Sequence, residues 1–222
     1  FIMKRFPVGP GNPLPPLWEN YSFQSVFVAV FEKGEFLCIQ DQPLEYIFLL
    51  QSGKVRACIL GPDGKNLLIN FYSKGSLIGD VEAILLQPEA VVSIQAINRV
   101  TCYAVPIEEF VKTAEVMPEL MNHMAILLAG RAKRSIRNTS VNILSTLETR
   151  LCAYISQTQH DGFFKENLAA LSELLGTSYR HLFRTLRSLC EKGILQKNGH
   201  SYQILDMEAL SKAAGGMYRI AP

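Results

Sequence analysis

The sequence predicts an α+β chain, in which an antiparallel β-barrel or jelly roll is followed by a long helix and a small helical domain with its own β-hairpin. Short apolar runs broken by Gly, Pro and Asp fill residues 22–105, whereas apolar residues at helical spacing dominate from Pro118 onward. The charge divides the chain similarly. Residues 1–130 carry 9 basic and 13 acidic groups, net −4, while residues 131–222 carry 13 and 7, net +6. A basic C-terminal part indicates a polyanionic partner.

Seven apolar runs are expected to form the strands of the barrel. Gly53, Gly64 and Gly75 recur every 11 residues, each near the end of a run, which is typical of the turns in a small antiparallel barrel. The clearest hairpin runs from Val55 to Tyr72 through a Gly-Pro-Asp-Gly turn, because Pro presets φ and Gly tolerates a positive φ. The seven runs are 23–31, 36–39, 46–50, 55–60, 66–72, 91–97 and 100–105.

The first half of the chain lacks the groups that a metal-dependent barrel enzyme needs. Its first 122 residues contain no histidine, and neither a Walker nor a GxGxxG phosphate loop is present. Asp80 and Glu82 lie two residues apart in what we expect to be a loop, so we interpret them as turn or surface groups and not as an acid/base pair. We therefore predict no catalytic residue, no metal site and no bound cofactor.

The cysteines and the hydropathy restrict the cellular compartment in which we expect the protein. The five Cys residues match no zinc, iron–sulfur or CxxC spacing, and we expect buried thiols, with a lone redox-sensing thiol as the alternative. No apolar run approaches the roughly 20 residues that cross a bilayer, and the N-terminal segment has no signal-peptide core. We expect a cytoplasmic protein with no membrane partner.

A long central helix is predicted from Pro118, at its first position, to about Arg137, after a short helix at 108–114. It carries two neighbouring apolar stripes. Because two separate stripes favour two separate partners, the second is predicted to pair with a second copy of the chain, and packing of both stripes on the barrel is the alternative. Residues 138–142 are the expected hinge. The first stripe contains Leu120 and Leu127, and the second contains Met121, Met124, Leu128 and Ala132 and continues to Ser135.

The C-terminal part predicts three helices followed by a hairpin. Ser145 to Glu148 is a capping-box pattern with Ser145 as N-cap, which begins a helix that reaches about Gln157. A short helix capped by Asn167 then ends at Gly176, and a second begins at Thr177-Ser178 and ends at Gly193. The inward positions are Leu168, Leu171, Leu174 and Leu175 in the first of this pair, and Leu182, Leu186, Leu189 and Cys190 in the second.

These two short helices form a helix-turn-helix, in which the small Ser172 permits a close approach of the pair. The run 194–197, a turn of type I′ at Asn198-Gly199 and the run 201–205 add a β-hairpin wing. Together they predict a winged helix-turn-helix. The wing residues that we assign to the binding surface are Lys197, Asn198, Gly199 and His200.

The exposed side of the second helix is rich in cations and rings. In the major groove an Arg side chain can pair with guanine O6 and N7, while Ser178 at the helix N-terminus can bind a phosphate. A merely solvated basic face is the alternative, but the charge lies at the end of the helix that enters double-stranded DNA in this motif. The predicted DNA-binding residues are Ser178, Tyr179, Arg180, His181, Arg184 and Arg187.

From Phe23 to Leu205 the chain resembles the CRP/FNR family of bacterial transcription regulators. The residues that carry this resemblance are Gly34-Glu35, Gly53, the Gly-Pro-Asp-Gly hairpin, Ile78-Gly79-Asp80, Gly176-Thr177-Ser178 and Arg184, and the motif 176–182 is most similar to the YeiL-type branch.

The resemblance implies a cyclic-nucleotide-binding-like barrel that senses an effector, a homodimer joined by the central helix, and RNA polymerase as a partner. The domains are then an effector-sensing barrel at 1–115, a dimerisation helix and hinge at 116–142, and a winged-helix DNA-binding domain at 143–222.

The chain also departs from the family pattern. Cyclic-nucleotide-binding members carry an Arg-Ser pair where this chain has Ala90 and Val91, and a Glu where it has Asp80. Burying a phosphate without a paired cation is costly, so we expect a small-molecule effector other than cyclic AMP. Phe183 occupies a position usually filled by a small residue. The expected effector pocket consists of Ile78, Gly79, Asp80, Ala90 and Val91.

Two other functions remain open on the sequence alone. One is a ligand-independent regulator, and the other is a sensor or interaction module whose winged helix binds protein instead of DNA.

Overall fold

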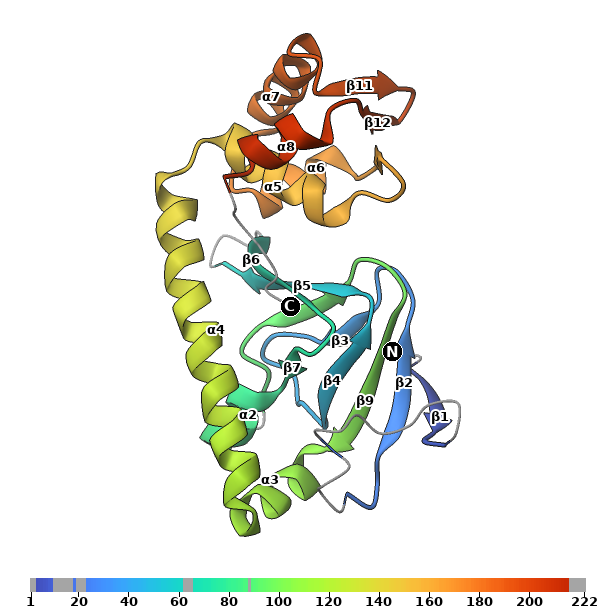
Figure 1. Cartoon of the computed structure of the whole chain (residues 1–222), viewed down its shortest axis with the longest axis vertical. Helices are drawn as coiled ribbons and strands as arrows, with labels where there is room; N and C mark the ends of the chain where they lie inside the picture. The colour runs from blue at the N-terminus through green and yellow to red at the C-terminus, as the bar shows by residue number, and fades with distance from the viewer. Residues whose placement is uncertain (1–2, 10–17, 19–22, 62–65, 88, 216–222) are drawn as a thin grey trace. The chain divides into compact units, whose positions relative to one another are not determined.

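A computed structural model describes residues 3–9, 18, 23–61, 66–87 and 89–215, with the backbone alone at 134–144. The chain divides into two compact units (Figure 1). The N-terminal unit comprises residues up to 59 together with 71–134, and the C-terminal unit comprises 60–70 together with 135–221.

The N-terminal unit is built on two sheets with strand orders β1-β2-β9-β4-β7 and β3-β8-β5-β6, although only residues 71–73 of β6 and residues up to 59 of β5 fall within this unit. β9 lies at the centre of the first sheet, because it pairs antiparallel with β2 on one side and with β4 on the other. The strands are β1 (Lys4–Pro7), β2 (Phe27–Phe31), β3 (Phe36–Cys38), β4 (Tyr46–Ser52), β5 (Lys54–Leu60), β6 (Asn66–Ser73), β7 (Leu77–Ile78), β8 (Ser93–Ala96) and β9 (Val100–Pro106).

Each of the seven predicted runs overlaps one of these strands, and the bounds differ by up to four residues. β5 and β6 are neighbours in their sheet, as the hairpin pattern predicts, while residues 62–65 of the turn lie outside the part that the structure describes. Gly53 joins β4 to β5 with φ +84, and a Cβ there would lie 2.3 Å from the Arg99 carbonyl oxygen, so the turn requires glycine. The sequence predicts neither β1 nor β7, which are only four and two residues long.

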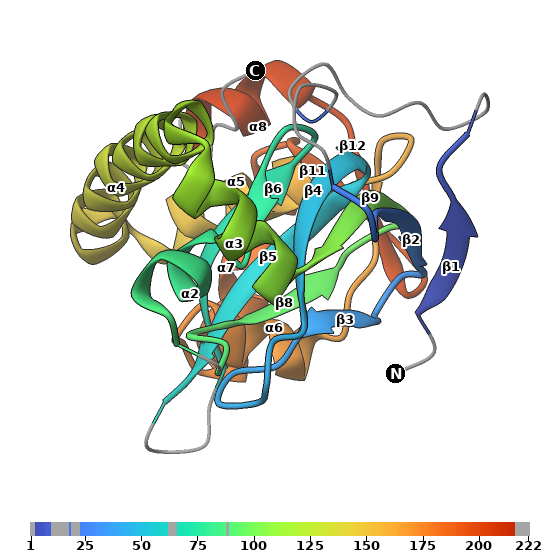
Figure 2. The same ribbon diagram turned by 90° about the horizontal axis from the view of Figure 1, so that it is seen from below.

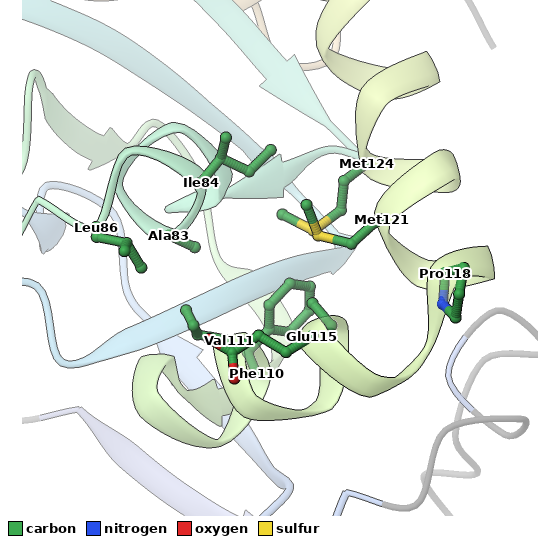
Figure 3. Close-up of a pocket in the computed structure, with 10 residues that line it drawn as sticks. Ala83, Ile84, Leu86, Phe110, Val111, Glu115, Pro118, Met121 and Met124 are labelled. Carbon is green, nitrogen blue, oxygen red and sulfur yellow. The ribbon is translucent and has the colours of Figure 1, made fainter.

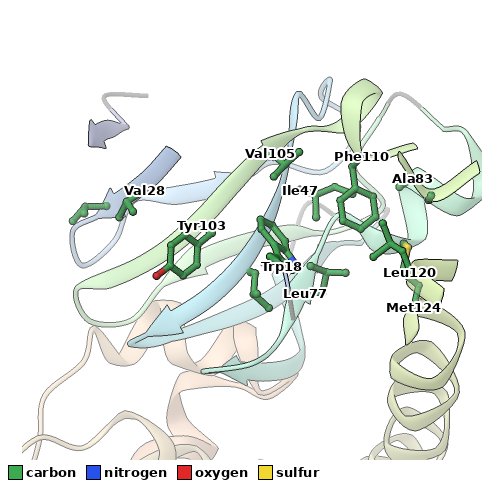
Figure 4. Packing of buried hydrophobic residues seen from close by; sticks show 13 residues of the cluster. Trp18, Val28, Ile47, Leu77, Ala83, Tyr103, Val105, Phe110, Leu120 and Met124 are labelled. Carbon is green, nitrogen blue, oxygen red and sulfur yellow. The ribbon is translucent and has the colours of Figure 1, made fainter. Parts of the chain in front are cut away.

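An aromatic cluster forms the centre of the N-terminal core (Figure 4). Trp18 is 1% exposed, and its ring centroid lies 6.3 Å from those of Tyr103 in β9 and Phe110. Phe110 belongs to α3 (Ile107–Val116), which packs against α2 (Asp80–Leu85), β4 and β9 (Figure 2). Each fully buried side chain of this size contributes about 1.5–3 kcal/mol relative to exposure, so the cluster ties α3 firmly to the sheet.

The central helix α4 spans Pro118–Leu144 and begins at Pro118, as expected. The predicted hinge at 138–142 is wrong, because this stretch continues the helix and the chain leaves it only after Leu144. Leu120 and Met124 are 2% and 1% exposed and join the N-terminal core, with Leu127 packed beside them. Their spacing of four and three residues places them on one face of the helix.

The burial of Met124 corrects the predicted dimer stripe. Met124 lies in the core of its own subunit and is not available to a second copy. Met121 is 40% exposed, Leu128 is half-buried and Ala132 is exposed, while the side chain of Ser135 lies outside the described residues. The spacing of apolar residues along the sequence predicts that Met124 lies on the stripe of Met121. In the structure it packs in the core together with Leu120 and Leu127.

The C-terminal unit contains a three-stranded sheet of order β10-β12-β11 and four helices within the residues described. The strand β10, which pairs with β12, is not predicted by the sequence because it has only two residues. The elements are α5 (Leu147–Thr158), β10 (Phe163–Phe164), α6 (Leu168–Leu174), α7 (Tyr179–Glu191), β11 (Leu195–Asn198), β12 (Ser201–Ile204) and α8 (Met207–Ala213).

Two local predictions in this unit are off by one residue. The N-cap of α5 is Thr146 and not Ser145, since the Thr146 hydroxyl accepts the Thr149 N–H at 3.2 Å. Glu148 does not reach back to the cap but binds Lys192 Nζ at 2.6 Å. In the wing, Asn198 pairs with Ser201, so the two-residue turn is Gly199-His200 and not Asn198-Gly199.

Candidate functional site

The turn between α6 and α7 follows from its local sequence. Asn167 caps α6 by accepting the N–H groups of Ala169 and Ala170, as predicted. Gly176 then adopts φ +60, which ends the helix and turns the chain. The buried Ser172 donates its hydroxyl to the Ala169 carbonyl at 2.7 Å, and its own carbonyl accepts the Thr177 N–H at 2.9 Å. The two helices are thereby held in a fixed helix-turn-helix.

Helix α7 has one apolar face and one polar face. Leu182, Leu186 and Leu189 are all 0% exposed and anchor the helix to its unit, as the sequence predicts, while Cys190 is only half-buried. The opposite face is exposed, and it carries all the predicted residues of this helix, Tyr179, Arg180, His181, Arg184 and Arg187. The buried face fixes the orientation of the helix, so these side chains form a surface that is directed outward.

The N-terminus of α7 is capped by Ser178, whose hydroxyl oxygen accepts the His181 N–H at 3.2 Å. His181 Nδ1 in turn lies 3.4 Å from the Thr177 hydroxyl. The Ser178 hydroxyl hydrogen is not used by this cap, so the residue can hold the helix end and still donate to an anion. The positive end of the helix dipole adds to the attraction of a negative group at this position.

The three arginines of α7 differ in their partners. Arg187 Nε is 2.9 Å from the Glu191 carboxylate, one helical turn away, and both side chains are exposed. Within the described part of the chain, Arg180 and Arg184 form no hydrogen bond or ion pair. Arg184 lines a shallow groove of about 490 Å³ together with His181 and the start of α5. Two guanidinium groups are therefore free to bind an external acceptor.

The wing is connected to α7 through an aromatic ring that was not among the predicted site residues. Lys197, Asn198, Gly199 and His200 are all exposed. Lys197 Nζ lies 6.0 Å from the centroid of the Phe183 ring, which also stacks on Tyr179. Phe183 follows Tyr179 by four residues, a spacing that places both on one face of a helix and that could have revealed it.

The expected effector pocket is organised around the short helix α2, which corrects our interpretation of its two carboxylates. Asp80 and Glu82 are not turn or surface groups, because they are 0% and 6% exposed. Arg131 of α4 donates to Asp80 Oδ1 at 2.7 Å and also binds the Leu77 carbonyl oxygen. Burial raises the pKa of the Asp80 carboxyl above its usual value, and the Arg131 guanidinium offsets part of that shift.

The segment 90–91 is joined to α2 by Glu82, whose carboxylate accepts the Val91 N–H at 2.9 Å. Ala90 is 1% exposed and exchanges backbone hydrogen bonds with Asp41 and Gln42, whereas the Val91 side chain is 45% exposed. Ile78 is buried, and Gly79 takes φ +92 at the start of α2. The structure thus brings Val91 to α2 through Glu82 and ties Asp80 to α4.

Two adjoining grooves are both lined by residues of α2 and α3. The first, of about 440 Å³, is lined by Met121 and Met124 of α4, Phe110 and Val111 of α3, and Ile84 of α2 (Figure 3). The second, of about 740 Å³, runs past the start of β4 and includes Glu82. Residues 78–80 and 90–91 do not line either of these two grooves.

The cysteine thiols are poor candidates for redox sensing. All five are free, and Cys58, Cys102 and Cys152 are buried. Burial raises the pKa of Cys38 to about 12 and that of Cys58 to about 11, and it also raises those of the other three. Because the thiolate is the reactive form, these shifts disfavour oxidation.

Neither a metal cluster nor a membrane span is found in the part of the chain that the structure describes. No group of three or more His, Cys, Asp or Glu side chains there could hold a metal ion. No helix among the same residues is long and apolar enough to cross a bilayer.

Comparisons with known proteins identify both units. Residues 28–115 match the cyclic nucleotide-binding domain family, and residues 149–213 match the Crp-like helix-turn-helix domain family. The regulatory protein YeiL of Escherichia coli O157:H7 is 27% identical over 83% of this chain and 84% of its own length. The transcriptional activator protein anr of Pseudomonas aeruginosa is 23% identical, over 83% and 79%.

Solved structures share the fold. A regulator of the CRP/FNR family from Eubacterium rectale superposes with a TM-score of 0.77 at 17% identity, over 90% of this chain and 98% of the other. The two family matches follow one another along the chain in the order that the structure shows, and the alignment with YeiL covers more than four fifths of both chains. The chain therefore belongs to the CRP/FNR family of DNA-binding transcription regulators, whose members are not enzymes.

Proposed function

We propose that this regulator acts in the cytoplasm as a homodimer that binds a pseudo-palindromic operator. The observation that carries the proposal is the exposed face of α7, where Arg180 and Arg184 have no partner among the described residues while three leucines at 0% exposure fix the helix from behind. In a dimer, two such helices would enter successive major grooves about 34 Å apart.

Each element of this surface has a distinct role in the proposal. Arg184 pairs with a guanine edge in the major groove, and Arg180 and Arg187 contribute charge close to the phosphates. Ser178 donates to a phosphate at the N-terminus of α7. The wing, from Lys197 to His200, contacts the adjacent backbone. Phosphate contacts then set the position of the protein, while base contacts set the sequence that it prefers.

The dimer contact is assigned to the face of α4 that its own subunit leaves uncovered. Met121, Ala125, Leu128 and Ala132 are spaced by four, three and four residues, and all but the half-buried Leu128 are exposed. This spacing forms a continuous apolar seam that suits a parallel copy of the same helix. Dimerisation through α4 would connect the sensor, the seam and the DNA-binding unit, in the domain order that the sequence predicts.

The effector of the N-terminal unit is proposed to be a small molecule other than cyclic AMP. Ala90 offers no cation to a phosphate, and the Val91 N–H is already bound by the Glu82 carboxylate. A phosphate at this position would therefore meet a negative charge instead of a positive one. Asp80 is likewise occupied, because it is paired with Arg131. Calorimetric titration with cyclic AMP should show no binding, and micromolar affinity would contradict the assignment.

Selection of bound sequences from a random DNA pool tests the central proposal. We expect an enriched motif with two-fold symmetry and half-sites one helical turn apart. Arg184→Ala should then weaken binding to that operator by about 1–3 kcal/mol in a gel-shift titration. Lys33→Ala, which removes an exposed charge from the other unit, is the matched control and should leave the affinity unchanged. A pool without any enriched motif would instead favour a winged helix that binds protein.

A further inference from the structure

Phe183 is an exposed aromatic residue on the face of α7 that we assign to DNA. Its side chain is 42% exposed, and that of Tyr179 is 53% exposed. The two rings are stacked, with centroids 6.4 Å apart and planes inclined by 13°. Leaving two large rings in water forgoes the burial that aromatic side chains normally gain, so this pair is a candidate for contact with a partner.

The surroundings of Phe183 hold the ring in place. It cannot turn inward, because Leu182 and Leu186 fill the buried side of the helix at 0% exposure. Tyr179 covers it on the N-terminal side, and Lys197 of the wing lies 6.0 Å from its centroid. The ring therefore forms a small apolar platform between the helix and the wing, with Arg184 next to it in the sequence.

The chemistry of the major groove identifies what this platform can recognise. Base edges there present hydrogen-bond donors and acceptors, and the one apolar group among them is the C5 methyl of thymine. A phenyl ring has no hydrogen-bonding group, so it would leave the donors and acceptors of other bases unsatisfied, whereas it can bury a methyl group. Arg184 is suited to guanine at the neighbouring position.

We propose that Phe183, supported by Tyr179, is a specificity determinant that contacts a thymine methyl group in each operator half-site. This inference rests on the proposed function, because it requires α7 to lie in the major groove. It adds a thymine preference that Arg184 alone does not provide, and it gives a role to a bulky residue where the family usually has a small one.

The test uses the full-length protein and the operator obtained by selection. Each thymine is replaced in turn by deoxyuridine, which lacks only the C5 methyl group, and affinity is measured by fluorescence anisotropy. One position in each half-site should weaken wild-type binding about fourfold when the methyl is removed, on the basis of the free energy of burying one carbon group. Phe183→Ala should bind the thymine and deoxyuridine operators equally, and Phe183→Leu should retain part of the difference.

A matched control separates this contact from a general effect of removing an exposed ring. Phe163 in β10 is 41% exposed and belongs to the same unit but not to α7, so Phe163→Ala should keep the wild-type deoxyuridine profile. Thermal unfolding of each variant should match that of wild type, and Phe183→Leu serves if the alanine variant is unstable.

The inference is overturned if wild-type binding is insensitive to deoxyuridine at every position, or if Phe183→Ala retains the same sensitivity. These results differ from failure of the proposed function. If the pool yields no operator, or if Arg184→Ala binds the operator as well as wild type does, the winged helix does not read DNA in this way, and the inference falls with it.

Discussion

At the scale of single residues, Arg131 of α4 contacts three separate groups of its unit. Its guanidinium binds Asp80 and the Leu77 carbonyl oxygen and lies 5.2 Å from the centroid of the Tyr72 ring. Asp80 Oδ2 is buried and has no hydrogen-bond partner among the described atoms. A buried carboxylate with one unsatisfied oxygen depends strongly on its cation, so the pair constrains α4 more than it contributes net stability.

Arg131→Met should therefore destabilise the protein by about 3–5 kcal/mol at neutral pH, because Asp80 is left as an uncompensated buried charge. The pKa of Asp80 in the folded state is raised from 3.8, and losing Arg131 should raise it further. A carboxyl with a raised folded pKa takes up a proton on folding, so its contribution to stability falls as the pH rises from 3.8 through the folded pKa. The stability that Arg131→Met loses relative to wild type should thus be smallest near pH 3.8 and should grow as the pH rises.

Urea unfolding at several pH values between about 4 and 8 measures this effect. Lys133→Met, two residues along the same helix and exposed, is the control and should behave like wild type at every pH. The double variant Asp80→Leu with Arg131→Met should recover most of the lost stability. A loss in Arg131→Met that does not change with pH would show that the charge of Asp80 is not its cause.

The residue scale also shows what can be predicted from the sequence. The spacing of Arg184 and its neighbours along the helix predicts that Arg184 lies on the exposed face of α7, and the structure leaves it exposed. Asp80 was misinterpreted because its partner lies 51 residues away, and only the tertiary fold brings Arg131 to it. A local sequence pattern predicts which face of a helix is buried, but it does not predict the charge that a distant element supplies.

At the scale of elements, α4 packs one face on its own core and leaves the neighbouring face exposed. Met124→Ala should cost about 2–5 kcal/mol, because it opens a cavity beside Phe110 and Leu120, whereas Met121→Ala should cost less than about 1 kcal/mol. Chemical denaturation at one fixed protein concentration measures both variants.

Dimer association, in contrast to folding stability, should depend more on Met121 than on Met124. Met121→Glu should shift the protein towards monomer in sedimentation velocity, because it places a charge in the exposed seam at a residue that is 40% exposed in the single chain. An unchanged dimer in Met121→Glu, or equal destabilisation by the two alanine variants, would contradict the assignment of these faces.

The elements that the sequence predicts are the ones whose signals are local. The long apolar runs of β4 and β9 are predictable because six and seven buried or half-buried residues in a row, respectively, leave a clear pattern. The helices α6 and α7 were found from their caps and glycines. The two-residue strands β7 and β10 have too few residues for a period, and their pairing depends on the neighbouring strand.

At the scale of the whole molecule, the charge asymmetry predicts how operator affinity depends on salt. The net charge of +2 conceals a surface on α7 and the wing to which Arg180, Arg184, Arg187 and Lys197 contribute. Operator affinity should fall steeply as salt is added, because each neutralised phosphate releases counterions.

Arg180→Ala is expected to reduce the slope of log K against log salt by about 1, while lowering affinity for all sequences to a similar degree. Anisotropy titrations at several salt concentrations, with operator and with unrelated DNA, measure both quantities. A slope unchanged from wild type would mean that Arg180 makes no phosphate contact.

The central position of β9 has a consequence for how the protein is made. Phe27 of β2 pairs with Ala104 of β9, so the middle of the first sheet joins segments that are far apart along the chain. A ribosome must therefore release everything up to β9 before this sheet can close, while the wing joins strands separated by two residues. Long-range pairing slows folding. We therefore expect the C-terminal unit, although translated last, to form quickly once it emerges, and the N-terminal unit to limit the rate at which the regulator matures.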